Sequence, residues 1–254
     1  MTGDGLVATD LEIRYGGHVA VGGVSLAAPL GRVTGLIGPN GAGKTSTFNA
    51  CSGLLTPIAG SIRLFGDEVI GRSPAARARL GLGRTFQRIA LFDSLSVADN
   101  VALGREAGLA GSSPWRQLVA TRAQRADVAD RTAAAIDDCG LGALAERTAG
   151  SLSTGQRRLV ELARVLAGDF RLLLLDEPSS GLDRGETQAF ADVLRRAVAE
   201  RGVGILLVEH DMDLALTLCE HLYVLDFGRP LFEGSPAEVR TSRVVRDAYL
   251  GSVA

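Results

Sequence analysis

The chain has 254 residues, of which 46% are hydrophobic and 22% charged, and its net charge is −2 at pH 7. This composition argues against disorder and indicates a globular protein of one large domain or two small ones. The small net charge excludes an overall basic field, so no nucleic-acid partner is expected. The longest apolar runs are too short to cross a bilayer, and the first ten residues carry no secretory signal. Cys51, Cys139 and Cys219 are expected to be reduced, buried side chains.

Short β-type segments predict antiparallel strands in the first thirty residues. The runs LVATDLEIR and VSLAAP form them, and the glycine pairs Gly16–Gly17 and Gly22–Gly23 predict turns between strands. The run RVTGLIG then predicts a buried strand, and residues 44–53 predict a helix that ends at Gly53.

Helical patterns dominate from about Ser96 to Leu144. Ser96 followed by Asp99 three residues later predicts an N-cap for a helix that starts at Val97, and the run EAGLAGSSP predicts a break within the segment. After it, helical runs alternate with the buried strands LLLLDE and GILLVEH. Strands that alternate with helices of this length indicate a parallel sheet covered on both faces.

These patterns predict one α/β domain, residues 1–254, with an antiparallel β subdomain at its N-terminus. Its core is expected to comprise residues 1–86 and 166–254, and an inserted helical subdomain residues 87–165.

The segment GPNGAGKTS fits the pattern of a phosphate-binding loop, with Gly38, Gly43, Lys44 and Thr45 at the required spacing. A glycine-rich turn between a strand and a helix points backbone N–H groups and a helix dipole at a phosphate. Lys44 is the one lysine among 27 basic residues, and its flexible charge can reach the β- and γ-phosphates, where the planar fork of arginine would not fit. Thr45 offers a hydroxyl to Mg²⁺. The alternative is a chance glycine turn, and the flanking strand and helix favour the phosphate loop.

The segment LLLLDEP ends an apolar strand with two adjacent carboxylates, Asp176 and Glu177. Such a strand delivers them to the carboxyl edge of the sheet, beside the phosphate loop. In a P-loop ATPase, Asp176 would hold Mg²⁺ through its water shell, and Glu177 would orient and deprotonate the attacking water. The alternative is a strand end that happens to be acidic.

The segment LSTGQRR, from Leu152 to Arg158, precedes an amphipathic helix and by itself would be an ordinary helix cap. Together with the two motifs above, it resembles the signature of the ATP-binding cassette (ABC) ATPases, whose core is a P-loop NTPase fold. The resemblance implies that Ser153 and Gly155 contact the γ-phosphate bound by another subunit. Thr154 occupies the family's second glycine position, a departure that recurs in the family.

Four further positions match this family in the expected order. The resemblance implies that Tyr15 stacks on adenine, that Gln87 links Mg²⁺ and water to the permease contact, that Asp183 lies in the loop crossing the dimer interface, and that His210 bonds the γ-phosphate. Each has an ordinary alternative: a strand tyrosine, a loop residue, or a structural histidine. The other two histidines match nothing and are expected to be structural.

The resemblance therefore implies an ATPase that uses ATP and Mg²⁺. The expected catalytic residues are Lys44, Gln87, Glu177 and His210. The expected Mg²⁺-associated residues are Thr45, Gln87 and Asp176. The residues expected to contact nucleotide are Tyr15, Gly38, Pro39, Asn40, Gly41, Ala42, Gly43, Lys44, Thr45, Ser46, Ser153, Gly155, Gln156 and Asp183.

The runs GLGRTFQRIALFDSLSVADNV and ILLVEHDMDLAL and the closing GSPAEVRTSRVVRDAYLG resemble the ATPases of branched-chain amino-acid importers. The resemblance implies a peripheral subunit at the cytoplasmic face of the cell membrane, docked under transmembrane permeases. It also implies a second cassette, identical or different, and an extracytoplasmic substrate-binding protein that acts indirectly. The ATPase of lipopolysaccharide export shares much of the C-terminal pattern and stays open as an alternative.

The residues after Gln87 are unusually apolar for a loop, namely Ile89, Leu91, Phe92 and Leu95. Our hypothesis is that part of this segment forms the groove for a coupling helix of the permease. The alternative is packing inside the helical subdomain.

Three other functions compete with a transporter ATPase, and we rank them below it. A soluble cassette protein of translation or DNA repair would usually carry two cassettes or long basic or coiled-coil insertions, which are absent here. A small-molecule kinase would not explain LSTGQRR or His210. A catalytically dead cassette is opposed by Glu177 and His210.

Overall fold

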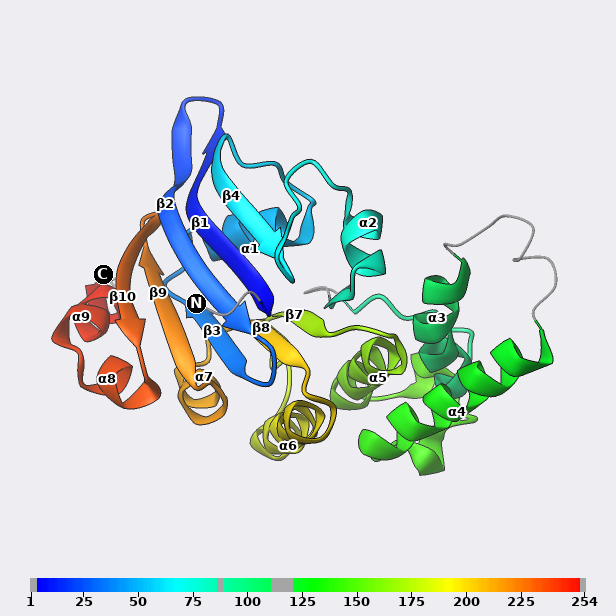
Figure 1. The fold of residues 1–254 in the computed structure, drawn as a ribbon. Helices are drawn as coiled ribbons and strands as arrows, with labels where there is room; N and C mark the ends of the chain where they lie inside the picture. Colours follow the sequence, from blue (N-terminus) through cyan, green and yellow to red (C-terminus); the bar gives the residue numbers. More distant parts are fainter. Residues whose placement is uncertain (1–3, 86–88, 111–120, 252–254) are drawn as a thin grey trace.

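The computed structural model describes residues 4–85, 89–110 and 121–251. Two β-sheets lie at the centre of the fold, with helix α1 (Lys44–Ser52) contacting strands of both (Figure 1). The side chains of Phe48 and Cys51 on α1 belong to the apolar cluster that fills the space between the sheets. The helix that follows the glycine loop is therefore held by packing from two sides.

The first sheet is antiparallel and has the strand order β2-β1-β4-β5. Its strands are β1 (Gly5–Tyr15), β2 (His18–Pro29), β4 (Ala59–Leu64) and β5 (Asp67–Glu68). The prediction of a β-turn at Gly16–Gly17 is confirmed, because Tyr15 pairs with His18 across it. The prediction of a turn at Gly22–Gly23 is wrong. Both glycines lie inside β2, where the pairing register shifts and Gly23 has a φ of 78°, so the pair forms a bulge.

The second sheet has the order β10-β9-β3-β8-β7-β6, and only its edge strand β10 is antiparallel. Its strands are β3 (Val33–Ile37), β6 (Leu82–Arg84), β7 (Leu172–Asp176), β8 (Gly204–Val208), β9 (His221–Asp226) and β10 (Arg229–Gly234). Alternate residues of β7 enter different clusters: Leu172 and Leu174 face the first sheet, and Leu173 and Leu175 face the helices. The predicted parallel sheet, buried on both faces, is confirmed.

Except for α2 (Pro74–Arg79), which lies beside β4 and contacts the end of α1 through Arg77, the remaining helices cover the outer face of the second sheet and extend beyond its β6 edge (Figure 1). These are α3 (Val97–Ala110), α4 (Arg122–Asp138), α5 (Thr154–Ala167), α6 (Arg184–Arg201), α7 (Met212–Leu218), α8 (Pro236–Thr241) and α9 (Arg243–Gly251), with 3₁₀ turns at Gly142–Leu144 and Ala149–Ser151. Helices α3, α4 and α5 pack on one another and form the helical part of the molecule.

Helix α3 confirms one prediction and corrects another. It starts at Val97, and the Ser96 hydroxyl accepts a hydrogen bond from the Asp99 backbone N–H at 3.0 Å, which is the expected N-cap. The predicted break at EAGLAGSSP is wrong for the first part of this run, because α3 continues through it to Ala110. A glycine inside a helix costs only about 1 kcal/mol, so Gly108 does not end it.

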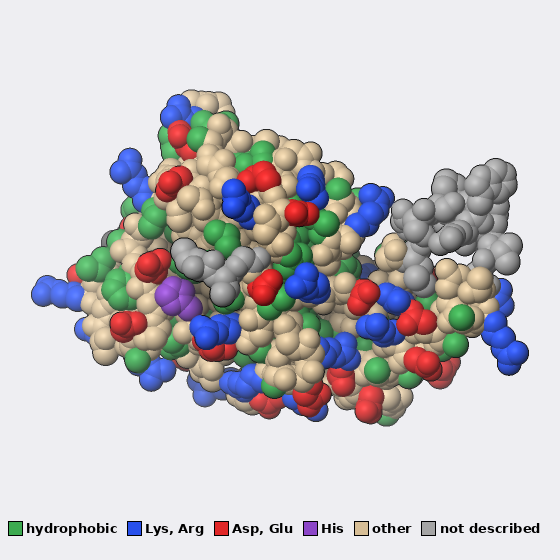
Figure 2. Space-filling model, in the orientation of Figure 1, with side chains coloured by type: hydrophobic (Ala, Val, Ile, Leu, Met, Phe, Trp, Pro, Cys, Tyr) green, Lys and Arg blue, Asp and Glu red, His purple; other side chains and the backbone are tan. Residues whose placement is uncertain are grey.

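Acidic and basic side chains are interspersed over the face drawn in Figure 2, which agrees with the small net charge. Within residues 4–85, 89–110 and 121–251, no helix is both long and apolar enough to span a membrane. The three cysteines are buried and reduced, as predicted.

Candidate active site

The glycine loop connects the end of β3 to the start of α1, and glycine is required at two of its positions. A Cβ on Gly38 would lie 2.2 Å from the carbonyl oxygen of Leu225, and one on Gly43 would lie 2.7 Å from that of Ala20. Gly43 also has a φ of 92° and is the N-cap residue of α1. Its backbone therefore makes the sharp turn that leaves the first N–H groups of α1 facing the loop.

Lys44 is buried and folds back over the loop that precedes it. Its Nζ donates to the carbonyl oxygens of Gly38 at 2.7 Å and Pro39 at 2.9 Å. Burial lowers the pKa of the Lys44 ammonium, and the charges of Glu177 and Asp176 oppose that shift. The ammonium is thus held by two backbone carbonyls of the loop, within the electrostatic influence of two carboxylates.

Asp176 and Glu177 end β7 at the same sheet edge as the glycine loop. Asp176 is 5% exposed, and burial raises the pKa of its carboxyl, while Arg84 and Lys44 lower it and Glu177 raises it further. Glu177 is a non-glycine residue with a φ of 46°, and its backbone N–H donates to the Val208 carbonyl at 2.9 Å. A left-handed residue costs about 1–3 kcal/mol, and such strain concentrates at functional sites.

His210 follows β8, the neighbour of β7 in the sheet. Its Nδ1 lies 3.8 Å from Glu177 Oε2 and 3.9 Å from Glu209 Oε2, and its side chain is 53% exposed. The parallel strands β3, β8 and β7 thus bring the glycine loop, His210 and the pair Asp176–Glu177 to one edge.

Two residues near this edge escaped the sequence analysis. Arg84, at the end of β6, donates from Nη2 to Asn49 Oδ1 at 2.8 Å and pairs with Asp176 Oδ2 at 3.5 Å. Glu209 has no exposed surface and accepts hydrogen bonds from backbone N–H groups. Both residues carry the sequence signal that identified Asp176, namely a charged side chain at the end of a buried strand or directly after it.

Tyr15 lies beside the start of α1, where its hydroxyl and the Ser46 hydroxyl are 3.3 Å apart. Its side chain is 52% exposed, so a ring face is available near the loop. Gln87, expected to join the same edge, lies outside the described residues.

The signature segment forms the N-terminus of α5, next to the N-terminus of α6. Ser153 accepts from the Gln156 backbone N–H at 3.2 Å, and Asp183 accepts from that of Glu186 at 2.8 Å; each belongs to a capping box. A Cβ on Gly155 would lie 2.1 Å from Glu186 Oε1, at the end of a flexible side chain, so the starts of α5 and α6 are in contact within the chain. In the described part of the molecule, no hydrogen bond joins Ser153 or Gln156 to the glycine loop.

A hollow of about 510 Å³ lies between α3, α5 and the segment after β6. Phe92, 57% exposed, lines this hollow together with Leu103 and Phe170. Leu91 instead packs against the core of the helical side. Of the apolar residues after position 88, Leu91 therefore contributes to the core and Phe92 to the wall of the hollow.

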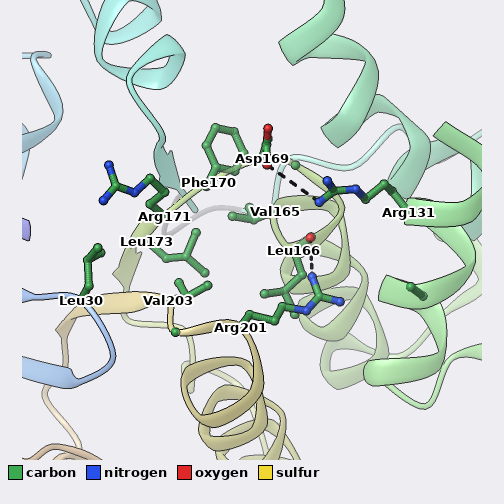
Figure 3. Close-up of a pocket in the computed structure, with 13 residues that line it drawn as sticks. Leu30, Arg131, Val165, Leu166, Asp169, Phe170, Arg171, Leu173, Arg201 and Val203 are labelled. Atoms are coloured by element: carbon green, nitrogen blue, oxygen red, sulfur yellow. Dashed lines mark hydrogen bonds and ion pairs between the residues drawn. The ribbon is translucent and has the colours of Figure 1, made fainter. Parts of the chain in front are cut away.

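A second hollow, of about 460 Å³, lies where β7 and β8 begin, at the sheet edge opposite the glycine loop. Figure 3 shows Arg201 reaching the end of α5, where it donates to the Leu166 carbonyl at 2.8 Å. Arg131 pairs with Asp169 across the rim at 3.8 Å. Arg201 and Arg131 are thus engaged by a helix carbonyl and a carboxylate, while Arg171, which also lines this hollow, lies over the Phe65 ring at 4.1 Å.

The sequence matches a family model described as ABC transporter over residues 21–180, and one described as branched-chain amino acid ATP-binding cassette transporter over residues 229–254. It is 36% identical to the high-affinity branched-chain amino acid transport ATP-binding protein BraF of Pseudomonas aeruginosa, over 97% of each chain. It is 38% identical to the lipopolysaccharide export system ATP-binding protein LptB of Acidithiobacillus ferridurans, over 97% of this chain and 96% of the relative. The crystal structure of the ADP conformation of an ATP-binding cassette of an ABC transporter has a TM-score of 0.85 and 29% identity, with 97% of this chain and 98% of that chain covered.

Proposed function

This chain belongs to the ABC transporter family, and we propose that it binds and hydrolyses ATP to power the uptake of branched-chain amino acids through a membrane permease. One observation carries the proposal: the glycine loop with Lys44, the pair Asp176–Glu177 and His210 meet at one edge of the parallel sheet. Three different strand ends thus supply groups for one phosphate.

ATP would lie with its phosphates against the backbone of residues 38–46 and its adenine on Tyr15. Lys44 would exchange its two carbonyl partners for the β- and γ-phosphates, since an ammonium prefers a charged acceptor to a neutral one. The position of Tyr15 beside Ser46, with half of its surface exposed, supports the stacking role.

The residues present fit Mg²⁺. Thr45 and Asp176 offer the oxygen donors that this ion prefers. Among the described residues, no three His, Cys, Asp or Glu side chains gather to hold a metal alone, as suits an ion that also binds phosphate and water. When bound, Mg²⁺ would supply positive charge at the phosphate oxygens. We assign Thr45, Asp176 and Gln87 to it, and Gln87 lies outside the described residues.

For hydrolysis, Glu177 would accept a proton from the attacking water, and Lys44 and His210 would stabilise charge on the γ-phosphate. The left-handed backbone at Glu177 supports this role, because it turns the residue away from the direction of the strand. The 3.8 Å approach of His210 supports a site shared by both side chains.

The site would be completed by a second cassette. Ser153, Gly155, Gln156 and Asp183 would then contact the nucleotide held by the partner. This is supported by the contact between the starts of α5 and α6, which makes them one surface, and by the lack of a hydrogen bond from Ser153 or Gln156 to the glycine loop in the described part of the chain. A second copy and a related cassette are both compatible with this arrangement.

The helical subdomain, residues 87–165, would connect this site to the permease, with residues 1–86 and 166–254 as the core. The hollow beside Phe92 would receive an apolar helix of the permease. Its position on the segment that follows Gln87 supports this, because docking there would act on a residue assigned to Mg²⁺ and water. The cassette would then sit at the cytoplasmic face of the membrane.

The choice of amino acids as cargo rests on the C-terminal match. BraF and LptB are similarly identical to this chain, so overall identity does not separate amino-acid uptake from lipopolysaccharide export. The match over residues 229–254 to a branched-chain amino acid model favours uptake. An extracytoplasmic binding protein would deliver the amino acid to the permease. Export remains the second candidate.

The test is purification of the tagged chain from detergent-solubilised native membranes. We expect two permeases and a second short cassette to co-purify, and deletion of the gene to abolish uptake of labelled leucine. Recovery of lipopolysaccharide-export components would instead support the second candidate. Recovery of ribosomes or DNA would remove transport and leave ATP hydrolysis standing.

A further inference from the structure

Glu209 is a buried carboxylate to which the proposed mechanism gives no role. It lies between the end of β8 and His210 and has no exposed surface. Among the described residues, no arginine or lysine forms an ion pair with it, and His210 Nδ1 lies 3.9 Å from its Oε2. Burial raises the pKa of this carboxyl, and hydrogen bonds from Ser179 and Asp211 oppose the shift. A buried carboxylate without a cation is costly unless polar hydrogens surround it.

The polar hydrogens come from the backbone of two different loops and from the Ser179 side chain. Glu209 Oε1 accepts from the Ser179 N–H at 3.1 Å. Oε2 accepts from the N–H groups of His210 at 3.2 Å and Asp211 at 3.4 Å. Ser179 follows β7 two residues after Glu177, whereas His210 and Asp211 follow β8. One carboxylate therefore joins the loop of the general base to the loop of the histidine.

We propose that Glu209 is a positioning residue that fixes the Glu177 loop and the His210 loop relative to each other. The inference rests on the roles proposed above for Glu177 and His210. Each loop leaves its strand independently, and the described hydrogen bonds between them near the site include the Glu177 N–H to Val208 carbonyl bond and the contacts to Glu209. A displacement of about 1 Å between reacting groups can cost about a hundredfold in rate.

Replacing Glu209 by glutamine tests the hydrogen bonds that bridge the two loops while leaving the size of the side chain almost unchanged. Gln has nearly the shape of Glu, but one of its oxygens is replaced by an NH₂ donor. Whichever way the amide turns, the NH₂ faces an N–H donor, so one loop loses its acceptor. The matched control is Glu161→Gln. Glu161 is 2% exposed and also accepts a backbone N–H, from Ala90 at 2.8 Å. Unlike Glu209 it pairs with Arg158, at 3.0 Å, and in the described part of the chain it hydrogen-bonds neither the Glu177 loop nor the His210 loop.

The experiment compares the full-length native chain, Glu209→Gln and Glu161→Gln in ATP hydrolysis, ATP binding and thermal unfolding. We expect kcat of Glu209→Gln to fall about tenfold to a hundredfold, with the ATP dissociation constant and Tm at the values of the control. Single-turnover hydrolysis in a His210→Ala background adds a second readout. There the effect of Glu209→Gln should shrink, because one group that it positions is already gone.

The inference is overturned if kcat is unchanged, if ATP binding and Tm fall together with kcat, or if the loss is the same with and without His210. If Glu209→Gln does not fold, Glu209→Asp, which keeps the charge but is one methylene shorter, is held to the same criteria. Absence of hydrolysis by the native chain would overturn the proposed function itself. Equal hydrolysis by the native chain and Glu209→Gln would overturn this inference alone.

Discussion

His210 Nδ1 lies 3.8 Å from Glu177 Oε2, although the two residues follow different strands. Strand β8 lies between β3 and β7, so the histidine is placed between the glycine loop and the acidic end of β7. Asp176 pairs with Val208 in adjacent strands, so Glu177 follows its paired residue directly and His210 lies two residues beyond its own. Strand order and register, and not any local motif, therefore create the proximity of Glu177 and His210.

Lys44 is expected to be irreplaceable by arginine. Its Nζ fits between the carbonyls of Gly38 and Pro39, at 2.7 and 2.9 Å, in a buried site where a planar guanidinium would clash. We expect Lys44→Arg to weaken ATP binding by about 2 kcal/mol, about thirtyfold in Kd, in a fluorescent-nucleotide titration. The matched control is Arg32→Lys, because the Arg32 side chain is 64% exposed. Unchanged ATP binding by Lys44→Arg would contradict the role of Lys44 as a compact charge that arginine cannot replace.

Phe92→Asp should abolish assembly with the permease while ATP binding survives. The side chain is exposed at the hollow between α3 and α5, so a charge there would meet the docking helix and not the core. Co-purification from membranes and nucleotide titration measure the two effects separately. Ile58→Asp, at another exposed apolar residue, is the control and should assemble normally. Loss of folding by Phe92→Asp would instead mean that Phe92 belongs to the core.

Arg77 holds the C-terminal end of the helix that follows the glycine loop. Although it is 1% exposed, its Nη1 donates to the carbonyls of Ala50 at 2.7 Å and Cys51 at 2.8 Å. Arg77→Met would leave these carbonyls unsatisfied, so we expect the free energy of unfolding to fall by about 3 kcal/mol in denaturant titration. Arg79→Met, at an exposed position of α2, the helix that also carries Arg77, should change the free energy of unfolding by less than about 0.5 kcal/mol. Equal effects of the two would contradict the assigned contacts.

The buried cysteines predict a loss of stability at alkaline pH. Burial raises the pKa of Cys51, Cys139 and Cys219 to about 12 each, whereas an unfolded thiol ionises near about 8.5. Between these values the native state retains protons that the unfolded state releases, so stability falls as pH rises. We expect each thiol to contribute a loss of about 2 kcal/mol between about pH 8 and pH 10. Denaturant unfolding should show a smaller loss of stability over this pH range for Cys51→Ala than for the native chain. An equal loss would contradict the raised pKa of Cys51.

Much of the site could be predicted because its main residues lie in short motifs at strand ends. Lys44, Asp176 and His210 each follow an apolar run, and parallel strands end at one edge. Arg84 and Glu209 could not be assigned roles, because their partners, Asn49 and Ser179, depend on strand order and loop path. The bulge at Gly22–Gly23 was mistaken for a turn for a similar reason: only the pairing with β1 distinguishes the two. Gly155 has an intrachain partner, Glu186, that no spacing rule reveals.

The central claim is that Glu177 is the general base of an ATP site shared by two cassettes. The most direct measurement is analytical ultracentrifugation of Glu177→Gln with ATP and with ADP, together with its rate of ATP hydrolysis. We expect hydrolysis to fall at least about a hundredfold and a dimer to persist with ATP and not with ADP. Hydrolysis at the native rate, or a monomer in both nucleotides, would contradict the account.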